Sequence, residues 1–290
     1  MLPPPSTQTV ASLLGHAQVD TAIACLGSLL AYSADSIRLR LHDDGSLTEG
    51  DRDRLSRALG DVVYVGRPEA DDRVADLLAR RPALAAYRRE SPLALKLVDT
   101  VLFSEGDTLS YCDSDVLFLR PFSGLFLFLA PVTEACFMRD SQNAYSVRSR
   151  HLMTEQRLRL PARVNTGLIH VRARCFDPDL LEWYLSRPEY CFAPPWVEQT
   201  AWALLAGNRT CRLFDPRQIA FPGASTASPS TVALHFVSPL RARLGEVLAH
   251  ASDRRGEAPV EIRSGLARRL SPLDLAATEA RRALRRLFLR

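Results

Sequence analysis

Short apolar runs alternate with amphipathic segments along the first part of the chain. Residues 9–14 form an apolar run typical of a buried strand, and apolar residues then recur at helical spacing between 19 and 30. Residues 37–41 read Ile-Arg-Leu-Arg-Leu, an alternation that predicts a half-buried strand ending in a turn. The alternation continues with a helix at 51–59, a strand at 62–65, helical material over 71–103 and a strand at 108–112.

The second part of the chain continues this order. We expect strands at 133–138, 163–171 and 231–237, a helix at 197–205 and a mobile loop at 222–230. Strands separated by helices predict an α/β fold with a mainly parallel, Rossmann-type mixed sheet, flanking helices and right-handed connections. We expect this domain to cover residues 1–245, followed by a basic, helical C-terminal extension over residues 246–290.

The composition is ordinary, but the charge is unevenly distributed. Apolar residues make up 47 % of the chain and charged residues 24 %, as in a soluble globular protein. The net charge is +4, yet residues 263–290 alone carry eight arginines against Asp274 and Glu279. Residues 270–290 therefore predict a basic amphipathic helix, which either packs on the body or lies on an anionic membrane surface. Nucleic-acid binding is not expected, because the arginines are not interleaved with aromatic residues.

Cysteine usage and the start of the chain indicate a cytoplasmic protein. The six cysteines are scattered and form no C-x-x-C pair, which argues against a zinc site or a disulfide framework. Residues 1–5 lack the pattern of a signal peptide, and the most apolar stretch, 124–132, is too short to span a bilayer. If the C-terminal helix lies on a membrane, we expect the protein to contact the inner face of that membrane.

Two carboxylates, Asp113 and Asp115, stand one residue apart directly after the expected strand at 108–112. Burying adjacent anionic groups unpaired is costly, so a positive charge is expected between them. Hard carboxylate oxygens suit a divalent cation such as Mg2+ or Mn2+, which commonly serves phosphate oxygens. A surface loop with a chance D-x-D is the alternative. The carboxyl edge of a parallel sheet is where ligands gather, which favours a nucleotide or sugar-nucleotide enzyme.

Four motifs in sequence order carry a resemblance to a known family. They are Tyr-Cys-Asp-Ser-Asp-Val at 111–116, Val-Asn-Thr-Gly-Leu at 164–168, Glu-Gln-Thr at 198–200 and His-Phe-Val-Ser-Pro-Leu-Arg at 235–241. Together they resemble the motifs of GT-A-fold glycosyltransferases, in particular glycosyltransferase family 8 and its bacterial relatives. The chain departs from the family pattern in having Glu198 for Asp, Ser238 for Gly and Arg241 for Lys.

The resemblance implies a metal site and a donor site. Asp113, Asp115 and His235 would hold Mn2+ or Mg2+, and Asp113 would also contact the ribose of a nucleotide. The donor would further contact Lys96, Asp44, Arg241 and Gly167, where the glycine lets the backbone pass close to it. Asp43, Arg88 and Arg89 are lesser candidates for donor contacts.

Each of these assignments has a structural alternative. His235 could be a core histidine, Gly167 a bend in an ordinary strand, and Asp43 and Asp44 plain turn residues. Lys96 could be a solvated residue on a helix face, although it is the only lysine beside thirty-six arginines.

The resemblance also implies catalytic roles for Asn165, Glu198 and Gln199. Asn165 would bind sugar or acceptor hydroxyls, while Glu198 and Gln199 would lie beside the anomeric carbon. The alternative is that Glu198 and Gln199 are ordinary first-turn helix residues.

The expected activity is metal-dependent transfer of a hexose from a nucleotide sugar, most simply a UDP-hexose, to an unidentified glycan or lipid-linked acceptor, with retention. Two alternatives stay open. One is a sugar-phosphate nucleotidyltransferase, although residues 14–18 lack its glycine-rich basic loop. The other is a catalytically silent sugar-binding protein of the same fold.

Overall fold

An eight-stranded mixed sheet forms the centre of the computed structural model, which describes residues 7–128, 130–223, 228 and 230–288, without the side chains of 286–288. Its strand order is β13-β9-β7-β8-β4-β1-β2-β3. Six strands run in one direction, whereas β8 and β13 run against their neighbours. The strands are β1 Gln8–Leu14, β2 Ile37–Asp43, β3 Val62–Val65, β4 Thr108–Cys112, β7 Ala135–Arg139, β8 Val164–Arg172, β9 Cys211–Phe214 and β13 Ser264–Leu266.

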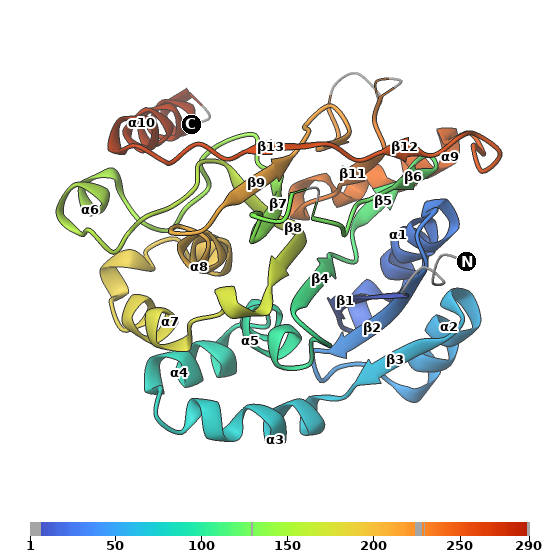
Figure 1. Cartoon of the computed structure of the whole chain (residues 1–290), viewed down its shortest axis with the longest axis horizontal. Helices are drawn as coiled ribbons and strands as arrows, with labels where there is room; N and C mark the ends of the chain where they lie inside the picture. Colours follow the sequence, from blue (N-terminus) through green and yellow to red (C-terminus); the bar gives the residue numbers. More distant parts are fainter. Residues whose placement is uncertain (1–6, 129, 224–227, 229, 289–290) are drawn as a thin grey trace.

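Helices cover both faces of this sheet (Figure 1). Neighbouring residues of β1 point to opposite faces, so that Val10 joins the core beneath α1 and α2 while Ala11 joins the core beneath α5 and α8. Parallel strands need such two-sided burial, which confirms the predicted α/β architecture. The helices are α1 Val19–Tyr32, α2 Glu49–Leu59, α3 Arg67–Leu78, α4 Pro82–Glu90, α5 Leu93–Leu102, α6 Ser149–Thr154, α7 Pro178–Leu185, α8 Val197–Leu205, α9 Leu244–His250 and α10 Pro272–Phe288.

Two small sheets flank the large one. The first has the order β10-β11-β5 and consists of β10 Ile219–Ala220, β11 Ala233–His235 and β5 Val116–Phe118. In it β11 runs antiparallel to β5, with His235 opposite Val116. The second pairs β12 Val260–Glu261 with β6 Phe122–Ser123. The pairing of β5 with β11 determines which side chains meet at the end of β4.

The expected helical region at 71–103 divides into three helices, α3, α4 and α5. Pro82 stands at the start of α4 and Pro92 caps α5, and proline interrupts a continuous helix because it lacks the backbone donor. Of the loop expected at 222–230, residues 224–227 and 229 lie outside the described residues.

The segment after residue 245 contains strands as well as helices. Besides α9 and α10 it contributes β12, and β13 forms an edge of the large sheet. The expected division of the chain at residue 245 stays a prediction.

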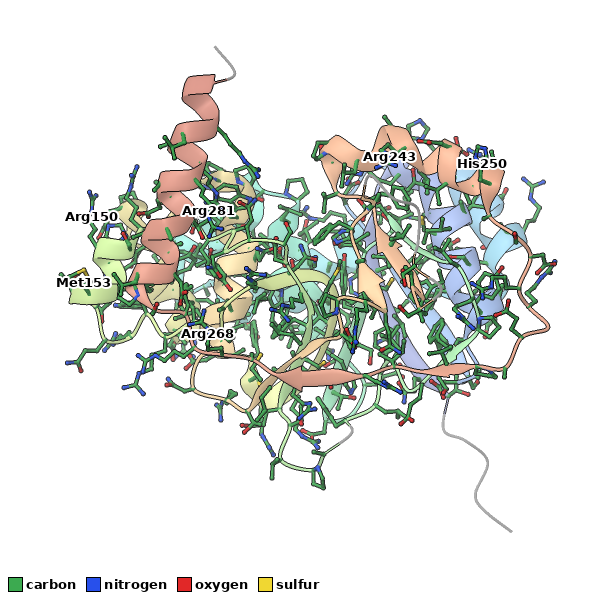
Figure 2. The ribbon with its side chains drawn as sticks, turned by 90° about the horizontal axis from the view of Figure 1, so that it is seen from above. Arg150, Met153, Arg243, His250, Arg268 and Arg281 are labelled. Atoms are coloured by element: carbon green, nitrogen blue, oxygen red, sulfur yellow. The ribbon has the colours of Figure 1, made fainter. Side chains whose placement is uncertain are left out.

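The C-terminal helix α10 packs against α6 at one end of the molecule (Figures 1 and 2). Leu275 and Thr278 of α10 are buried, and Glu279 of the same helix accepts hydrogen bonds from the backbone amide and the hydroxyl of Ser149 at 3.0 and 2.8 Å. Leu273 and Leu284 remain 82 % and 53 % exposed. None of the described helices combines the length and the apolar character needed to cross a bilayer.

Candidate metal centre and adjoining cleft

Strand pairing brings Asp113, Asp115 and His235 together. The D-x-D lies in the short turn between β4 and β5, and His235 ends β11, the strand that pairs with β5. The backbone amide of Phe236 donates to the carbonyl of Asp115 at 2.9 Å. One ligand atom from each of the three side chains lies within 4.8 Å of the others. Nε2 of His235 lies 3.2 Å from Asp115 Oδ1 and 3.5 Å from Asp113 Oδ2.

Charge dominates this cluster. Burial works against a charged ring at His235, but hydrogen bonds to both aspartates outweigh it and raise its pKa to about 9. Burial would raise the pKa of Asp113, but the nearby positive charges, chiefly the ammonium of Lys96, together outweigh this effect. The pKa of Asp113 therefore lies below its usual value. Two carboxylates and an imidazole form a donor set that fits a divalent cation, and such an ion would take the place of the proton on the ring.

Lys96 lies inside the molecule and not on a solvated helix face. It is 2 % exposed, and its Nζ lies 3.0 and 3.2 Å from the two carboxylate oxygens of Asp113 and 3.7 Å from Glu198 Oε1. Tyr111 supports the same carboxylate, because its hydroxyl donates to Asp113 Oδ1 at 2.9 Å and its ring lies beneath the ammonium. Burial opposes the charge of Lys96, but Asp113 and Glu198 prevail and raise its pKa.

Glu198 lies at the start of α8 with its carboxylate directed inward. Its Oε2 accepts from the hydroxyl of Thr166 at 2.9 Å. Burial is the main reason that its pKa is raised to about 7, although Lys96 works in the opposite direction. Glu198 is therefore a buried acid that titrates near neutral pH.

Asn165 and Gln199 form a chain of hydrogen bonds that ends at His235. Gln199 Nε2 donates to the carbonyl of Ala144 at 2.7 Å and to Asp140 Oδ2 at 3.3 Å, and its Oε1 accepts from Asn165 Nδ2 at 3.2 Å. Asn165 Oδ1 lies 3.1 Å from His235 Nδ1 and orients the ring, so that Nε2 faces the two aspartates.

Gly167 makes room for the imidazole. A side chain at this position would overlap the Cε1 and Nδ1 atoms of His235. We expected the glycine to let the backbone pass close to a donor, but in the structure the space beside it holds the ring of His235. The backbone carbonyl of Gly167 also accepts from the amide of Asp113 at 2.8 Å.

Arg241 and Asp44 line the same cleft. Nε of Arg241 donates to Asp115 Oδ2 at 2.9 Å from a half-exposed position. Asp44 Oδ1 accepts from the backbone of Ser46 at 2.9 Å, and its carboxylate occupies the space that a side chain at Gly15 would fill.

Three lesser candidates lie elsewhere and do not line the cleft. Asp43 accepts backbone bonds within its turn and pairs with an arginine of α2. Arg88 is buried in a two-bond ion pair with Asp99, with both contacts at 2.8 Å. Arg89 pairs with its exposed neighbour Glu90. Donor contact by these residues stays a prediction, which their place outside the cleft lining does not support.

The predicted residues converge on a cleft of about 910 Å3, a volume typical of sites for cofactor-sized ligands. Sequence reasoning missed Asp140 and Trp196, which also line it. A signal existed for Asp140, since it directly follows β7 at the edge of the sheet where the D-x-D lies. The predicted site residues that line the cleft are Asp44, Lys96, Asp113, Asp115, Asn165, Glu198, Gln199, His235 and Arg241.

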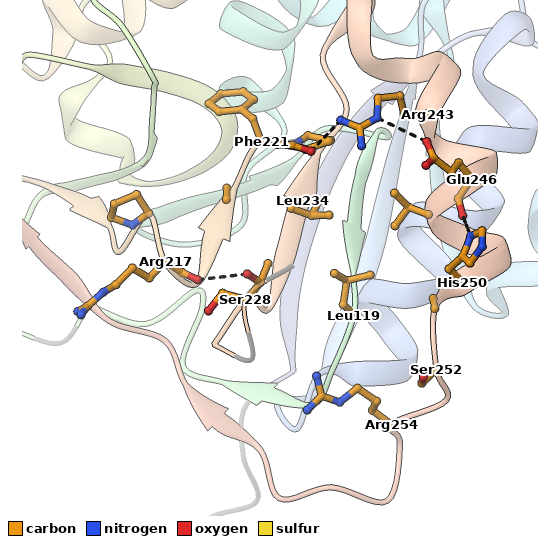
Figure 3. A pocket seen from close by; sticks show the side chains of 17 residues that line it. Leu119, Arg217, Phe221, Ser228, Leu234, Arg243, Glu246, His250, Ser252 and Arg254 are labelled. Carbon is orange, nitrogen blue, oxygen red and sulfur yellow. Dashed lines mark hydrogen bonds and ion pairs between the residues drawn. The ribbon is translucent and has the colours of Figure 1, made fainter. Parts of the chain in front are cut away.

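A second large cavity, of about 950 Å3, adjoins the cleft, and its lining is drawn in Figure 3. Leu234 lines this cavity, whereas the next residue of β11, His235, lines the cleft. Residues 221–223 line both, and Arg243 holds them by donating to the carbonyl of Gly223 at 2.9 Å.

Comparisons with solved structures show the fold. Mouse xyloside xylosyltransferase 1 (apo form) superimposes with a TM-score of 0.57 at 12 % identity, covering 81 % of this chain and 99 % of that one. The galactosyltransferase LgtC in complex with donor and acceptor sugar analogs gives 0.57 at 15 % identity, covering 87 % and 98 %. The bifunctional glycosyltransferase WbbM, in its apo structure, gives 0.52 at 10 % identity, covering 82 % and 47 %. The chain therefore has the GT-A fold, and its place in glycosyltransferase family 8 stays a prediction.

Comparisons of the sequence with known proteins do not assign the chain to a family. No family model matches the chain. A 48-residue segment is 50 % identical to the glycine cleavage system H protein of Psychrobacter sp. (strain PRwf-1). This match covers 17 % of the present chain and only 38 % of that protein's length, so it bears on neither the fold nor the cleft.

Proposed function

We propose that this chain is a metal-dependent glycosyltransferase that moves a hexose from a nucleotide sugar, a UDP-hexose, to a glycan or lipid-linked acceptor. The observation that carries the proposal is the convergence of Asp113, Asp115 and His235 on a cleft within a GT-A fold. The likeness to LgtC, whose complex holds donor and acceptor sugar analogs, supports a cleft that receives both substrates.

Asp113, Asp115 and His235 would hold Mn2+ or Mg2+, which when bound supplies positive charge to the diphosphate of the donor. Arg241 adds a guanidinium at the open side of the same cluster, where it can bind a phosphate oxygen. Lys96 is buried beneath Asp113 and keeps that carboxylate ionised for its role as a ligand. These cations would together stabilise the departing nucleoside diphosphate.

The proposal includes retention of the anomeric configuration, which rests on the family resemblance. Glu198 and Gln199 are the side chains best placed to support positive charge at the anomeric carbon. Both are held by other residues, Glu198 by Lys96 and Thr166 and Gln199 by three hydrogen bonds. Fixed side chains of this kind suit electrostatic support better than nucleophilic attack. The acceptor's proton would then pass to the leaving phosphate.

The decisive experiment is a screen of nucleotide sugars for Mn2+-dependent hydrolysis. We expect turnover with a UDP-hexose and a fall of roughly a hundredfold or more in Asp115→Asn, since removal of a metal ligand removes charge stabilisation of several kcal/mol. Asp61→Asn is the matched control, because Asp61 is exposed at the far edge of the sheet. Equal turnover by wild type and Asp115→Asn with every donor would refute the proposal.

Two further assays, of pyrophosphate release and of UDP binding, separate the rival functions. A nucleotidyltransferase would release pyrophosphate from a nucleoside triphosphate and a sugar phosphate. A silent binding protein would bind UDP in the presence of Mn2+ without turning over any donor.

We further propose that the protein works in the cytoplasm, in contact with the inner membrane surface through α10. Its six cysteines are all free, as in a reducing compartment. Leu273 and Leu284 are exposed eleven residues apart, about three helical turns, and so share one face of α10. Arg281 and Arg285 lie beside them. In liposome sedimentation with anionic vesicles, we expect Leu273→Asp/Leu284→Asp to lose binding, and equal partitioning with the wild type would refute membrane contact.

A further inference from the structure

A small cavity lined by arginines lies between α10 and the segment that follows β7. It has a volume of about 200 Å3. Arg281 marks its position on α10 in Figure 2. Among the described residues, its lining contains four arginines and no acidic residue. The lining residues are Ser141, Gln142, Asn143, Arg163, Thr278, Arg281, Arg282 and Arg285. We call this cavity the arginine pocket.

The charge of three of these arginines is not balanced within the described part of the chain. There, no carboxylate pairs with Arg163, Arg281 or Arg285. The nearby acids are engaged elsewhere, since Glu279 accepts from Ser149 and Asp274 pairs with Arg268. Arg163, Arg281 and Arg285 line one small volume, their like charges repel each other, and an anion bound among them would relieve that repulsion.

The backbone holds this arrangement in place. Arg163 is the only residue other than glycine with a positive φ, 61°, among those the structure describes. Its amide donates to Asn143 Oδ1 at 3.1 Å, and its carbonyl accepts from the amide of Asp140 at 2.8 Å. A left-handed backbone at a bulky residue is unfavourable and persists only where the surroundings fix it, which is common at binding sites. Asn143 also ties the segment to α10 by donating to Thr278 Oγ1.

The arginine pocket adjoins the cleft. Ser141 and Gln142 line both cavities. Arg282 donates to Gln142 Oε1 at 3.2 Å, and its guanidinium lies 4.0 Å above the ring of Trp196, which lines the cleft. A molecule with one end in the cleft can therefore place an anionic group among the arginines.

We propose that the arginine pocket binds a phosphate group carried by the acceptor, an inference that rests on the proposed glycosyl transfer. One guanidinium group can donate two parallel hydrogen bonds to two oxygens of a phosphate. A cluster of arginines therefore favours a phosphate over neutral sugar hydroxyls. The donor's diphosphate is served by other residues, those around Asp113 and Arg241. The acceptor class is thus a phosphorylated glycan, either a soluble sugar phosphate or a phosphate attached to a lipid.

The test measures binding without metal or donor, so it does not depend on catalysis. The full chain in EDTA is dialysed to equilibrium against radiolabelled glucose 1-phosphate or glucose. In a second arm it is sedimented with phosphatidylcholine vesicles with and without phosphatidic acid. Arg163→Gln/Arg285→Gln removes two of the unpaired charges, and Arg80→Gln/Arg89→Gln removes two exposed charges outside the arginine pocket. Arg285→Gln alone changes one exposed side chain of α10, and circular dichroism verifies that each variant is folded.

We expect the Arg163/Arg285 variant to lose about tenfold or more in phosphate affinity, the single variant to lose less, and the control to match the wild type. Loss in the dialysis arm identifies a soluble phosphate. Loss in the vesicle arm alone identifies a lipid phosphate when Arg163→Gln, a change outside α10, shows it as well. Loss confined to Arg285→Gln reflects contact of α10 with the membrane and counts against the proposal. If the Arg163/Arg285 variant matches the control in both arms, or glucose binds as well as glucose 1-phosphate, the proposal is wrong. Failure of the proposed function would appear separately, as absence of metal-dependent donor turnover by the wild type.

Discussion

Replacing Lys96 by methionine tests the charge balance of the site. Methionine nearly matches lysine in length but removes the ammonium that lies 3.0 and 3.2 Å from the oxygens of Asp113 and 3.7 Å from Glu198. Removing one partner from a buried ion pair costs about 3–5 kcal/mol, because the remaining charge stays buried without compensation. Lys96 is 2 % exposed, so water cannot take its place. We expect Lys96→Met to lose about 3–5 kcal/mol of unfolding free energy at pH 8 in the absence of metal.

The loss should depend on pH in a defined direction. The pKa of Glu198 is already raised by burial to about 7, against 4.5 for an ordinary glutamate, and loss of Lys96 raises it further. At pH 6 the folded variant therefore keeps a proton on Glu198, whereas the unfolded chain has lost it. Stability of the variant falls as pH rises from 6 to 8, since the folded state binds more protons than the unfolded state. The destabilisation should be smaller at pH 6 by about 1 kcal/mol. Between pH 6 and pH 8 the wild type, with a Glu198 pKa of about 7, loses about 1.4 kcal/mol through this group, whereas the variant can lose at most about 2.7 kcal/mol.

The assay is urea unfolding followed by tryptophan fluorescence, in EDTA, at pH 6 and pH 8. Lys96→Arg keeps the charge, and Arg89→Met removes an exposed charge outside the cleft. A loss below about 1 kcal/mol at pH 8, or equal losses at the two pH values, would refute the reasoning.

Two further predictions concern residues whose surroundings are equally specific. Gly167→Ala should displace the ring of His235 and cost about 1–3 kcal/mol by overpacking, with weaker Mn2+ binding by calorimetry. Unchanged Mn2+ affinity would contradict this. Burial, with a smaller contribution from Arg40, lowers the pKa of His42 to about 3. Below about pH 6.5 the unfolded chain therefore binds more protons at His42 than the folded chain does. The free energy of unfolding then falls as pH is lowered, by up to about 1.4 kcal/mol per pH unit. His42→Leu should reduce that slope in urea unfolding between pH 5 and pH 7.5, and equal slopes would count against it.

The inner elements of the fold could be predicted because each has its own apolar pattern in the sequence. The strand at 108–112 and the helix at 197–205 appear where their apolar patterns place them. The edge of the sheet could not be predicted in the same way, because β9 has four residues and β13 has three, with a glycine in the middle. Strands this short are formed by pairing with neighbours, and pairing is not visible in a local pattern.

The same limit applies to the site. The spacing of motifs identified Asp113, Asp115 and His235, which the structure brings together. It ranked Arg88 below Lys96 but kept both as candidates, because both are basic residues in the same helical region. Only the fold shows that one lies beneath Asp113 while the other is neutralised by Asp99.

A chain with a single lysine offers a practical consequence. Since Lys96 is the only side-chain amine and is buried against the cleft, reductive methylation can modify only one side chain, and only when the cleft admits the reagent. The extent of modification, read by mass spectrometry, becomes a direct gauge of how often the floor of the cleft opens. Incubation with candidate nucleotides would then show protection at one peptide, so that Lys96 reports the occupancy of the cleft.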